Sequence, residues 1–433
     1  MLPHALDFVP ERDAELFAAV PAAAAVFALR AAGAGAEPYV AKTANLRRRL
    51  QRLLGASQER TRKLNLRERV ARVEYAPTGS DFESGFLLYQ VLRREFPDTY
   101  EKRLRLRFAP LVRLHLENRY PRVSVTTQLS GAKSGSVFYG PFASRMAAEK
   151  FANDALDFFK LRRCVEELNP DPAFPGCIYS EMKMCLAPCF KGCTDQQYAS
   201  ETARVQTFFD TRGQSLAREM AAERDRASAE LQFENAASLH ARLDKLTPVL
   251  AQLPEITRRL DRLDGLMIQP CAEPDAVTFF RVQGGCVSAP IPFQVNLNPA
   301  NSTTSPCQVG PGASPGLPSA APESSVAAGG HTRGKHAPLS MEARVNEALA
   351  AAADSPHRSQ KETLEHLAIL KRWYFRSVKA GEIFFADDKG ELPMRRIVRG
   401  ISRVFRGEKP AADLDQTARD YWINRGKEVE RSS

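Results

Sequence analysis

The sequence predicts an α+β protein divided into several small units. Short apolar runs of strand length alternate with segments of helical periodicity. A long stretch, from about residue 194 to 262, is helical in pattern with few breakers, and a later stretch is rich in Pro, Gly and Ser. With 433 residues, 43% of them hydrophobic and 26% charged, the chain can bury more than one core.

Residues 1–100 predict the first α/β unit. The runs 22–30 and 36–41 have the texture of two short strands joined by the turn "AAGAGAE". An arginine-rich helix follows "YVAK", and "DFESGFLLYQVLRREF" predicts a second helix that ends at Pro97.

Residues 101–295 predict four further segments. Residues 101–163 alternate as strands in "RLRLRF", "PRVSVTT" and "SVFYGPF" and then turn helical. A cysteine cluster occupies 164–193, a hairpin of long helices 194–262, and a small β segment 263–295.

The remaining chain predicts a linker and a basic end. Residues 296–358 contain too few large apolar side chains to offset the entropy of ordering, so we expect a disordered linker. Residues 359–433 combine an amphipathic helix, "LEHLAILKRWYFRS", with the basic run "MRRIVRGISRVFRGEK", which predicts a C-terminal helical basic segment.

Composition indicates the kind of partner. The net charge of +10 favours an acidic partner, nucleic acid before an anionic membrane surface. Acidic residues precede the apolar N-terminal run, and the chain lacks an uninterrupted apolar run of about 18 to 20 residues. We therefore expect a soluble cytoplasmic protein with no membrane partner, whose cysteines are thiols or metal ligands.

The cysteine spacing suggests a metal centre. Cys164, Cys177, Cys185 and Cys189 follow the pattern C-x12-C-x7-C-x3-C. Structural zinc sites usually show two tight pairs, whereas iron–sulfur clusters accept wider loops. An iron–sulfur cluster is therefore favoured, with zinc and free buried thiols as alternatives; the other four cysteines show no such pattern.

Several motifs together carry a family resemblance. "AAVFAL", "YVAKTANLRRRL", "FYGPF", "CLAPC" and "ELQFENAASLHARLDKL" follow one another over roughly residues 20 to 295. In this order they resemble the UvrC family of excinucleases and its shorter member Cho. The resemblance implies a GIY-YIG nuclease domain at 1–100, a 4Fe-4S cluster on the same four cysteines, and a UVR motif.

The resemblance also implies a nuclease site. Carried over by position, its residues are Tyr39, Lys42 and Arg49, and hydrolysis there would use Mg2+ or Mn2+. Phe27 stands where the family has a tyrosine, and Leu53 stands where it has another. These substitutions remove hydroxyl groups that could orient or deprotonate water.

A missing carboxylate makes the site degenerate. The glutamate position falls on Leu88, and the run from Gly85 to Arg94 contains no acidic residue. Glu83 lies about 140° away around a helix, and Glu95 about 10 Å along it, so neither replaces the metal ligand directly. We expect a site that grips a phosphate and does not split it.

The basic helix and the later motif predict two binding surfaces. Lys42, Arg47, Arg48 and Arg49 are expected to contact DNA phosphates, although a solvated basic face is the alternative. The UVR resemblance implies docking of a UvrB-like helicase. The docking residues would be Leu231, Phe233, Glu234, Ala236 and Ala237. A helical hairpin that buries its own seam is the alternative.

These features lead to one functional prediction and two alternatives. We predict a UvrC/Cho-like nucleotide-excision-repair protein that binds DNA and a UvrB-type partner and whose nuclease site is inactive. The first alternative is an active metal-dependent endonuclease that cuts beside a lesion. The second is an iron–sulfur DNA-binding regulator.

Overall fold

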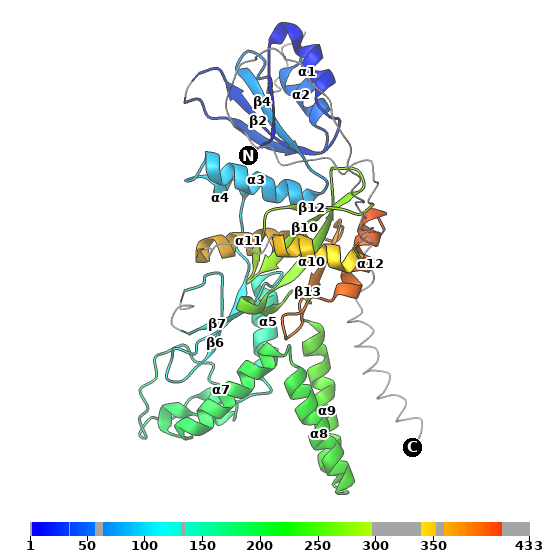
Figure 1. Ribbon diagram of the computed structural model, residues 1–433. Coiled ribbons are helices and arrows are strands. Elements are labelled where there is room, and N and C mark those ends of the chain that lie inside the picture. The colour runs from blue at the N-terminus through cyan, green and yellow to red at the C-terminus, as the bar shows by residue number, and fades with distance from the viewer. Residues whose placement is uncertain are drawn as a thin grey trace, which may run out of the picture.

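Helices and antiparallel sheets together form the chain, so the predicted α+β class is confirmed (Figure 1). The computed structural model describes residues 2–33, 35–56, 64–130, 135–296, 339–351 and 359–408. Within these ranges the strands belong to three separate sheets.

The first sheet has the order β1-β4-β2-β3, and all of its neighbouring strands run antiparallel. Its strands are β1 (His4–Asp7), β2 (Ala25–Ala31), β3 (Tyr39–Thr43) and β4 (Val70–Pro77). The predicted strands at 22–30 and 36–41 correspond to β2 and β3. The register pairs Phe27 with Ala41 on one side and with Tyr75 on the other.

Helices cover both faces of this first sheet (Figure 1). On one face lie α1 (Asp13–Ala19) and α2 (Leu46–Leu54), whose leucines pack with Phe27 and Leu29. On the other face lies α3 (Asp81–Glu95), which contacts β2 and β3 and is followed by α4 (Tyr100–Leu104). Ser80 begins α3 by accepting a hydrogen bond from the Glu83 N–H, as helix N-caps do.

The second sheet has the order β6-β5-β7-β8. Its strands are β5 (Leu111–Leu114), β6 (Val123–Thr126), β7 (Val137–Gly140) and β8 (Arg258–Arg259), and α5 (Arg145–Leu156) packs on it. The strand predicted at "RLRLRF" was wrong. Its alternating arginines are exposed rather than paired across a sheet, and Arg105, with a φ of 50°, ends α4 instead.

The region predicted as a helical hairpin contains three helices. After the short α6 (Ile178–Glu181) come α7 (Asp195–Asp210), α8 (Gln214–Ala229) and α9 (Phe233–Ala251). Helices α8 and α9 form a hairpin that projects from the body (Figure 1). Short 3-10 turns occur at Pro10–Arg12, Pro188–Phe190 and Leu260–Arg262.

The third sheet unites the small β segment with the C-terminal segment. Its strands are β9 (Gly265–Pro270), β10 (Ala276–Gln283), β11 (Cys286–Val287), β12 (Ile291–Gln294) and β13 (Glu382–Phe385). Because side chains alternate along a strand, β9 buries Leu266 and Ile268 against α10 and α12 and Met267 against α3 and α11. The three added helices are α10 (Met341–Ala351), α11 (Gln360–Tyr374) and α12 (Met394–Phe405).

Helix α10 corrects part of the linker prediction. Most of 296–358 lies outside the described residues, but Met341–Ala351 is helical. Val345 and Leu349 of α10, four residues apart on one helix face, are buried against the third sheet.

The described helices include none that is both long enough and apolar enough to cross a membrane.

Candidate functional site

Helix α2 turns its leucines inward and its arginines outward. Asn45 caps the helix by accepting a hydrogen bond from the Arg48 N–H, at 2.9 Å. Leu46, Leu50 and Leu53 are buried against the sheet. Leu53, one of the substituted positions of the predicted nuclease site, is therefore a core residue.

Tyr39 and Arg49, two residues of the expected nuclease site, are in direct contact. The Arg49 Nη2 donates a hydrogen bond of 2.8 Å to the Tyr39 hydroxyl. The Arg49 Nε is buried and has no hydrogen-bond partner among the described residues. A guanidinium with a donor to spare, next to a phenol, is suited to a phosphate oxygen.

The other three cations point elsewhere. Lys42, three residues after Tyr39 on the same strand, lies on the opposite face of the sheet and forms an ion pair with Asp81 of α3. Arg47 donates to the Val20 carbonyl at the end of α1, at 3.0 Å, while Arg48 is exposed. The structure thus joins Arg49 to Tyr39 but separates both from Lys42.

The substituted positions Phe27 and Leu88 belong to different cores. Phe27 is fully buried between the sheet and α2, with its ring centroid 6.1 Å from that of Tyr39. Leu88 is half-buried on α3, where it packs in the same core as Val40. The sheet lies between the two side chains.

The three acidic residues of α3 all have partners. Glu83 accepts a hydrogen bond of 2.7 Å from the Gly79 N–H, and burial raises its pKa. Glu95 accepts two hydrogen bonds from Arg30, at 2.9 and 3.2 Å, and these lower its pKa. Asp81 pairs with Lys42 and with Arg376.

These pairings leave no ready ligands for a catalytic divalent cation. Across the described ranges, no group of three or more His, Cys, Asp or Glu side chains is arranged to hold a metal. The residues around Arg49 therefore do not fit the Mg2+ or Mn2+ that hydrolysis would need.

The four cysteines of the predicted cluster gather in one loop region. Burial, with smaller contributions from Cys164, Cys189 and Cys177, raises the pKa of Cys185 to about 11, so these thiols lie within electrostatic range of one another. All four are free thiols. Within the described residues, these four thiols are neighbours but are not arranged as a closed set of metal ligands.

Hydrogen bonds to sulfur shape this loop. The Ala187 N–H donates to the Cys185 Sγ at 3.3 Å, and the Cys177 side chain caps α6. Lys183, Ala187 and Lys191 have positive φ angles, which non-glycine residues adopt at a cost and which turn the chain sharply. The Ala187 N–H stabilises the thiolate of Cys185 and offsets part of the rise in its pKa.

Sequence analysis missed a buried arginine beside the cysteines. Arg162 is 4% exposed, and its guanidinium donates to the Tyr120 carbonyl at 2.9 Å, the Glu166 carbonyl at 2.8 Å and the Cys164 Sγ at 3.5 Å. It anchors the start of the cysteine loop to the second sheet. Its position two residues before Cys164 could have indicated that it lies beside the cysteines.

The tip of the α8–α9 hairpin presents apolar side chains. Leu231 is 73% exposed and Phe233 65%. Glu234 and Ala237 are also exposed, while Ala236 is half-buried. Further along α9, Leu239 is buried. The hairpin thus has a buried seam, and its tip remains open.

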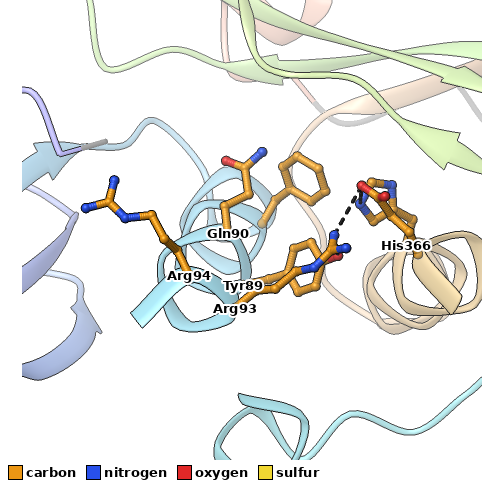
Figure 2. A pocket seen from close by; sticks show the side chains of 7 residues that line it. Tyr89, Gln90, Arg93, Arg94 and His366 are labelled. Carbon is orange, nitrogen blue, oxygen red and sulfur yellow. Dashed lines mark hydrogen bonds and ion pairs between the residues drawn. The ribbon is translucent and has the colours of Figure 1, made fainter. Parts of the chain in front are cut away.

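A cleft of about 410 Å3 separates α3 from α11 (Figure 2). Tyr89, Gln90 and Arg93 line one wall, and His366 lines the other. Arg93 reaches across to Glu362 at 3.2 Å. Sequence analysis found no signal for this contact, because its partners are far apart in the chain.

Below the cleft lies a buried carboxylate. Glu365 of α11 is fully buried and accepts hydrogen bonds from the Tyr89 hydroxyl, at 2.7 Å, and from the Tyr100 hydroxyl. Burial raises the pKa of both tyrosines. The two phenols therefore remain donors and hold α11 against α3 and α4.

Residues 110–208 match a family model described as UvrC/Cho excinuclease, middle domain. UvrABC system protein C of Acidobacterium capsulatum is 32% identical over 222 residues, which cover 51% of this chain and 33% of that protein. The same protein of Symbiobacterium thermophilum is 27% identical over 251 residues, 57% of this chain and 39% of that protein. The chain spans about a third of the length of the curated relatives it matches. No solved structure matches it.

Proposed function

Because the chain belongs to a UvrC/Cho-like family, we propose that it is a nucleotide-excision-repair protein that binds DNA and a UvrB-type partner. The match of residues 110–208 to the middle domain of UvrC/Cho excinucleases carries this proposal. The relatives are named as protein C of a UvrABC system, which supports UvrB as the partner. The excess of cations supports the nucleic acid.

The first domain is proposed to be GIY-YIG-like and to bind DNA without cutting it. The half-buried guanidinium of Arg49 lies next to the Tyr39 hydroxyl, which supports a phosphate contact. Phe27 lacks the hydroxyl, Leu88 lacks the carboxylate, and the acidic residues of α3 are engaged elsewhere. Without a metal ligand and a group to move a proton, the site loses the means to stabilise charge on a leaving oxygen.

The cysteine loop is proposed to hold a 4Fe-4S cluster on Cys164, Cys177, Cys185 and Cys189. Four free thiols within electrostatic range of one another fit its donor set, and so do N–H groups directed at sulfur. When bound, the cluster would cross-link segments that enclose α6. A single zinc ion on the same thiols is the competing occupant.

The hairpin tip is proposed to dock the UvrB-type partner, as a UVR motif does. Phe233 and Leu231 offer apolar area that the fold leaves in water, and Glu234 adds a charge beside them. A helix from a partner could cover this tip while the hairpin keeps its own seam.

One experiment tests the proposed activity. Purified holoprotein is incubated with a damaged duplex, Mg2+ or Mn2+, and a UvrB homologue, and binding and incision are followed together. We expect binding at low salt without incision. Incision that Arg49→Ala abolishes would instead establish the active-endonuclease alternative. Failure to bind any DNA at low salt would contradict the repair function itself.

A further inference from the structure

We propose that the first domain and the C-terminal segment share one cationic band that binds the phosphodiester backbone of a nucleic acid. The cationic band consists of Lys42, Arg105, Arg107, Lys371, Arg372 and Arg376. This inference rests on the proposed DNA-binding function. It assigns the binding to a surface that Arg47, Arg48 and Arg49 do not form.

One end of the band joins β3 to the end of α11. Asp81, at the start of α3, forms ion pairs with both Lys42 and Arg376. The side chains of Lys42 and Arg376 are 36% and 44% exposed. One carboxylate shared by two cations leaves a net positive charge on an accessible surface.

The other end joins α11 to the turn after α4. The Arg372 Nη2 donates to the carbonyls of Leu104 and Arg105, at 3.3 and 2.9 Å, so α11 lies directly against this turn. Arg105 ends α4 with a left-handed backbone, and Arg105 and Arg107 are both exposed. Arg376 lies just past the end of α11, and its charge helps to lower the pKa of Arg372, so the row of cations continues to the Asp81 ion pairs.

Like charges crowd each other within the band. Burial, followed by the guanidiniums of Arg107 and Arg372, lowers the pKa of Lys371. The pKa of Arg372 is lowered in the same way, by loss of solvent and by Arg376 and Arg107, more than Asp81 raises it. Such repulsion costs stability in the free protein and is relieved when a polyanion binds.

The contact between α3 and α11 keeps the band in register. Tyr89 and Tyr100 hold Glu365, and Arg93 holds Glu362 across the cleft (Figure 2). Because Glu365 lies on α11 about two turns before Arg372, this buried network fixes the direction in which the last turn of the helix projects. The cations therefore need little reordering to meet a regular row of phosphates.

The arginines of α2 make a poorer surface by comparison. Arg47 is turned to the end of α1, and Arg49 is turned to Tyr39, so Arg48 is the exposed arginine of the three. The cationic band instead draws on three segments of the chain, and all of its cations except the half-buried Lys371 are exposed. An extended phosphate backbone needs such a row of contacts rather than a single one.

The test compares two sets of three charges on the full-length protein. The band variant is Arg107→Gln with Lys371→Gln and Arg376→Gln. The control variant is Arg218→Gln with Arg242→Gln and Lys245→Gln, which removes the same charge from exposed positions on the α8–α9 hairpin. Binding of a fluorescent 30-base-pair duplex is measured by anisotropy at several salt concentrations, and folding by thermal unfolding.

We expect the band variant to bind more than about tenfold more weakly at 100 mM salt, since each phosphate contact is worth up to about eightfold there. Its slope of log K against log salt should fall by about 2 to 3, while the control changes little. The exposed single variant Arg107→Glu should weaken binding even if the triple variant unfolds.

Three other outcomes would overturn the inference. If the parent binds DNA and both triple variants lose the same amount of DNA affinity, binding follows net charge and does not depend on the band. If the parent binds and the band variant is unchanged, the inference fails while the proposed function stands. If the parent binds phosphatidylserine vesicles and no nucleic acid, the band serves a membrane surface, and the proposed function fails as well.

Discussion

The first domain and the cysteine loop differ in whether their reactive side chains have partners within the protein. Around α2 and α3 nearly every group with catalytic potential is engaged in structure: Glu95 with Arg30, Glu83 with the Gly79 N–H, and Asp81 with Lys42. In the cysteine loop, by contrast, four thiols approach one another and remain free.

The difference separates residues that maintain a fold from residues that await a ligand. An ion pair within the first domain satisfies both partners, so that region gains nothing from a metal. Crowded thiols raise one another's pKa, and a metal that binds thiolates removes this penalty. The family model matches residues 110–208 and so includes the cysteine loop but not the first domain, while the local pairing of side chains tells the two regions apart.

The largest effect is expected for the four free thiols of the cysteine loop. Anaerobically purified protein should be brown and contain about four irons per chain. Cys185→Ser should remove the colour and the iron, because Cys185 lies within electrostatic range of the other three thiols. Iron content by colorimetric assay and the visible absorbance give the measurement.

The matched control is Cys193→Ser, which alters a neighbouring thiol outside the proposed ligand set and should leave the iron in place. A colourless parent with one tightly bound zinc would replace the cluster with a zinc site. Equal iron loss in both variants would mean that the ligand assignment is wrong.

A smaller effect is expected for the buried carboxylate of Glu365, which already has hydrogen-bond partners within the protein. Glu365→Ala should lower the free energy of unfolding by about 3 kcal/mol, because it strips two buried tyrosine hydroxyls of their acceptor. Tyr100→Phe, which removes one donor and leaves Tyr89 in place, should cost about 1 kcal/mol. Urea denaturation measures both; an equal cost would show that the Tyr100 hydrogen bond accounts for the whole effect and that the Tyr89 bond adds nothing.

Sequence reasoning succeeded where a local pattern specifies a local result. The apolar runs located β2, β3 and α3, and the arginine helix began after "YVAK" as predicted. It failed at "RLRLRF", because alternating arginines imitate a strand without an apolar face to bury. It also missed α10, whose apolar face is complete only against a sheet assembled from distant segments.

The candidate site was predictable only in part for a similar reason. The family resemblance assigned Tyr39 and Arg49 to one site, and their contact lies within one strand–helix unit. Lys42 was grouped with Arg49, although its spacing of three from Tyr39 on a strand already indicated the other face. The cationic band joins residues some 270 positions apart, and no local pattern encodes such a contact.

The next smaller effect is expected at the hairpin tip, where large apolar side chains are exposed to solvent. Phe233→Ala should weaken binding of a UvrB C-terminal helix by about 2 kcal/mol, roughly thirtyfold, as truncated aromatic anchors do. Stability should change by less than about 0.5 kcal/mol, since the ring is 65% exposed. Leu239→Ala, in the buried seam, should show the reverse pattern, and calorimetry with thermal unfolding separates the two.

The smallest effect concerns the pH dependence of two carboxylates on α3. Arg30 lowers the pKa of Glu95 from its ordinary 4.5, so the native state binds that proton less readily than the unfolded chain. The stabilisation, about 1 kcal/mol for a partly exposed pair, is present above pH 4.5 and is lost as the pH falls through the native pKa. Glu95→Gln should abolish this loss.

Glu83 supplies the control of opposite sign on the same helix. Burial raises its pKa above 4.5, so the native state holds its proton more tightly, and its contribution to stability declines as the pH rises through that range. Subtracting the urea-unfolding curves of Glu95→Gln and Glu83→Gln from the parent between about pH 3 and 7 should therefore give slopes of opposite sign. If added Mg2+ instead stabilised the parent and neither variant, both carboxylates would be metal ligands, and the contrast between an engaged first domain and an open cysteine loop would be lost.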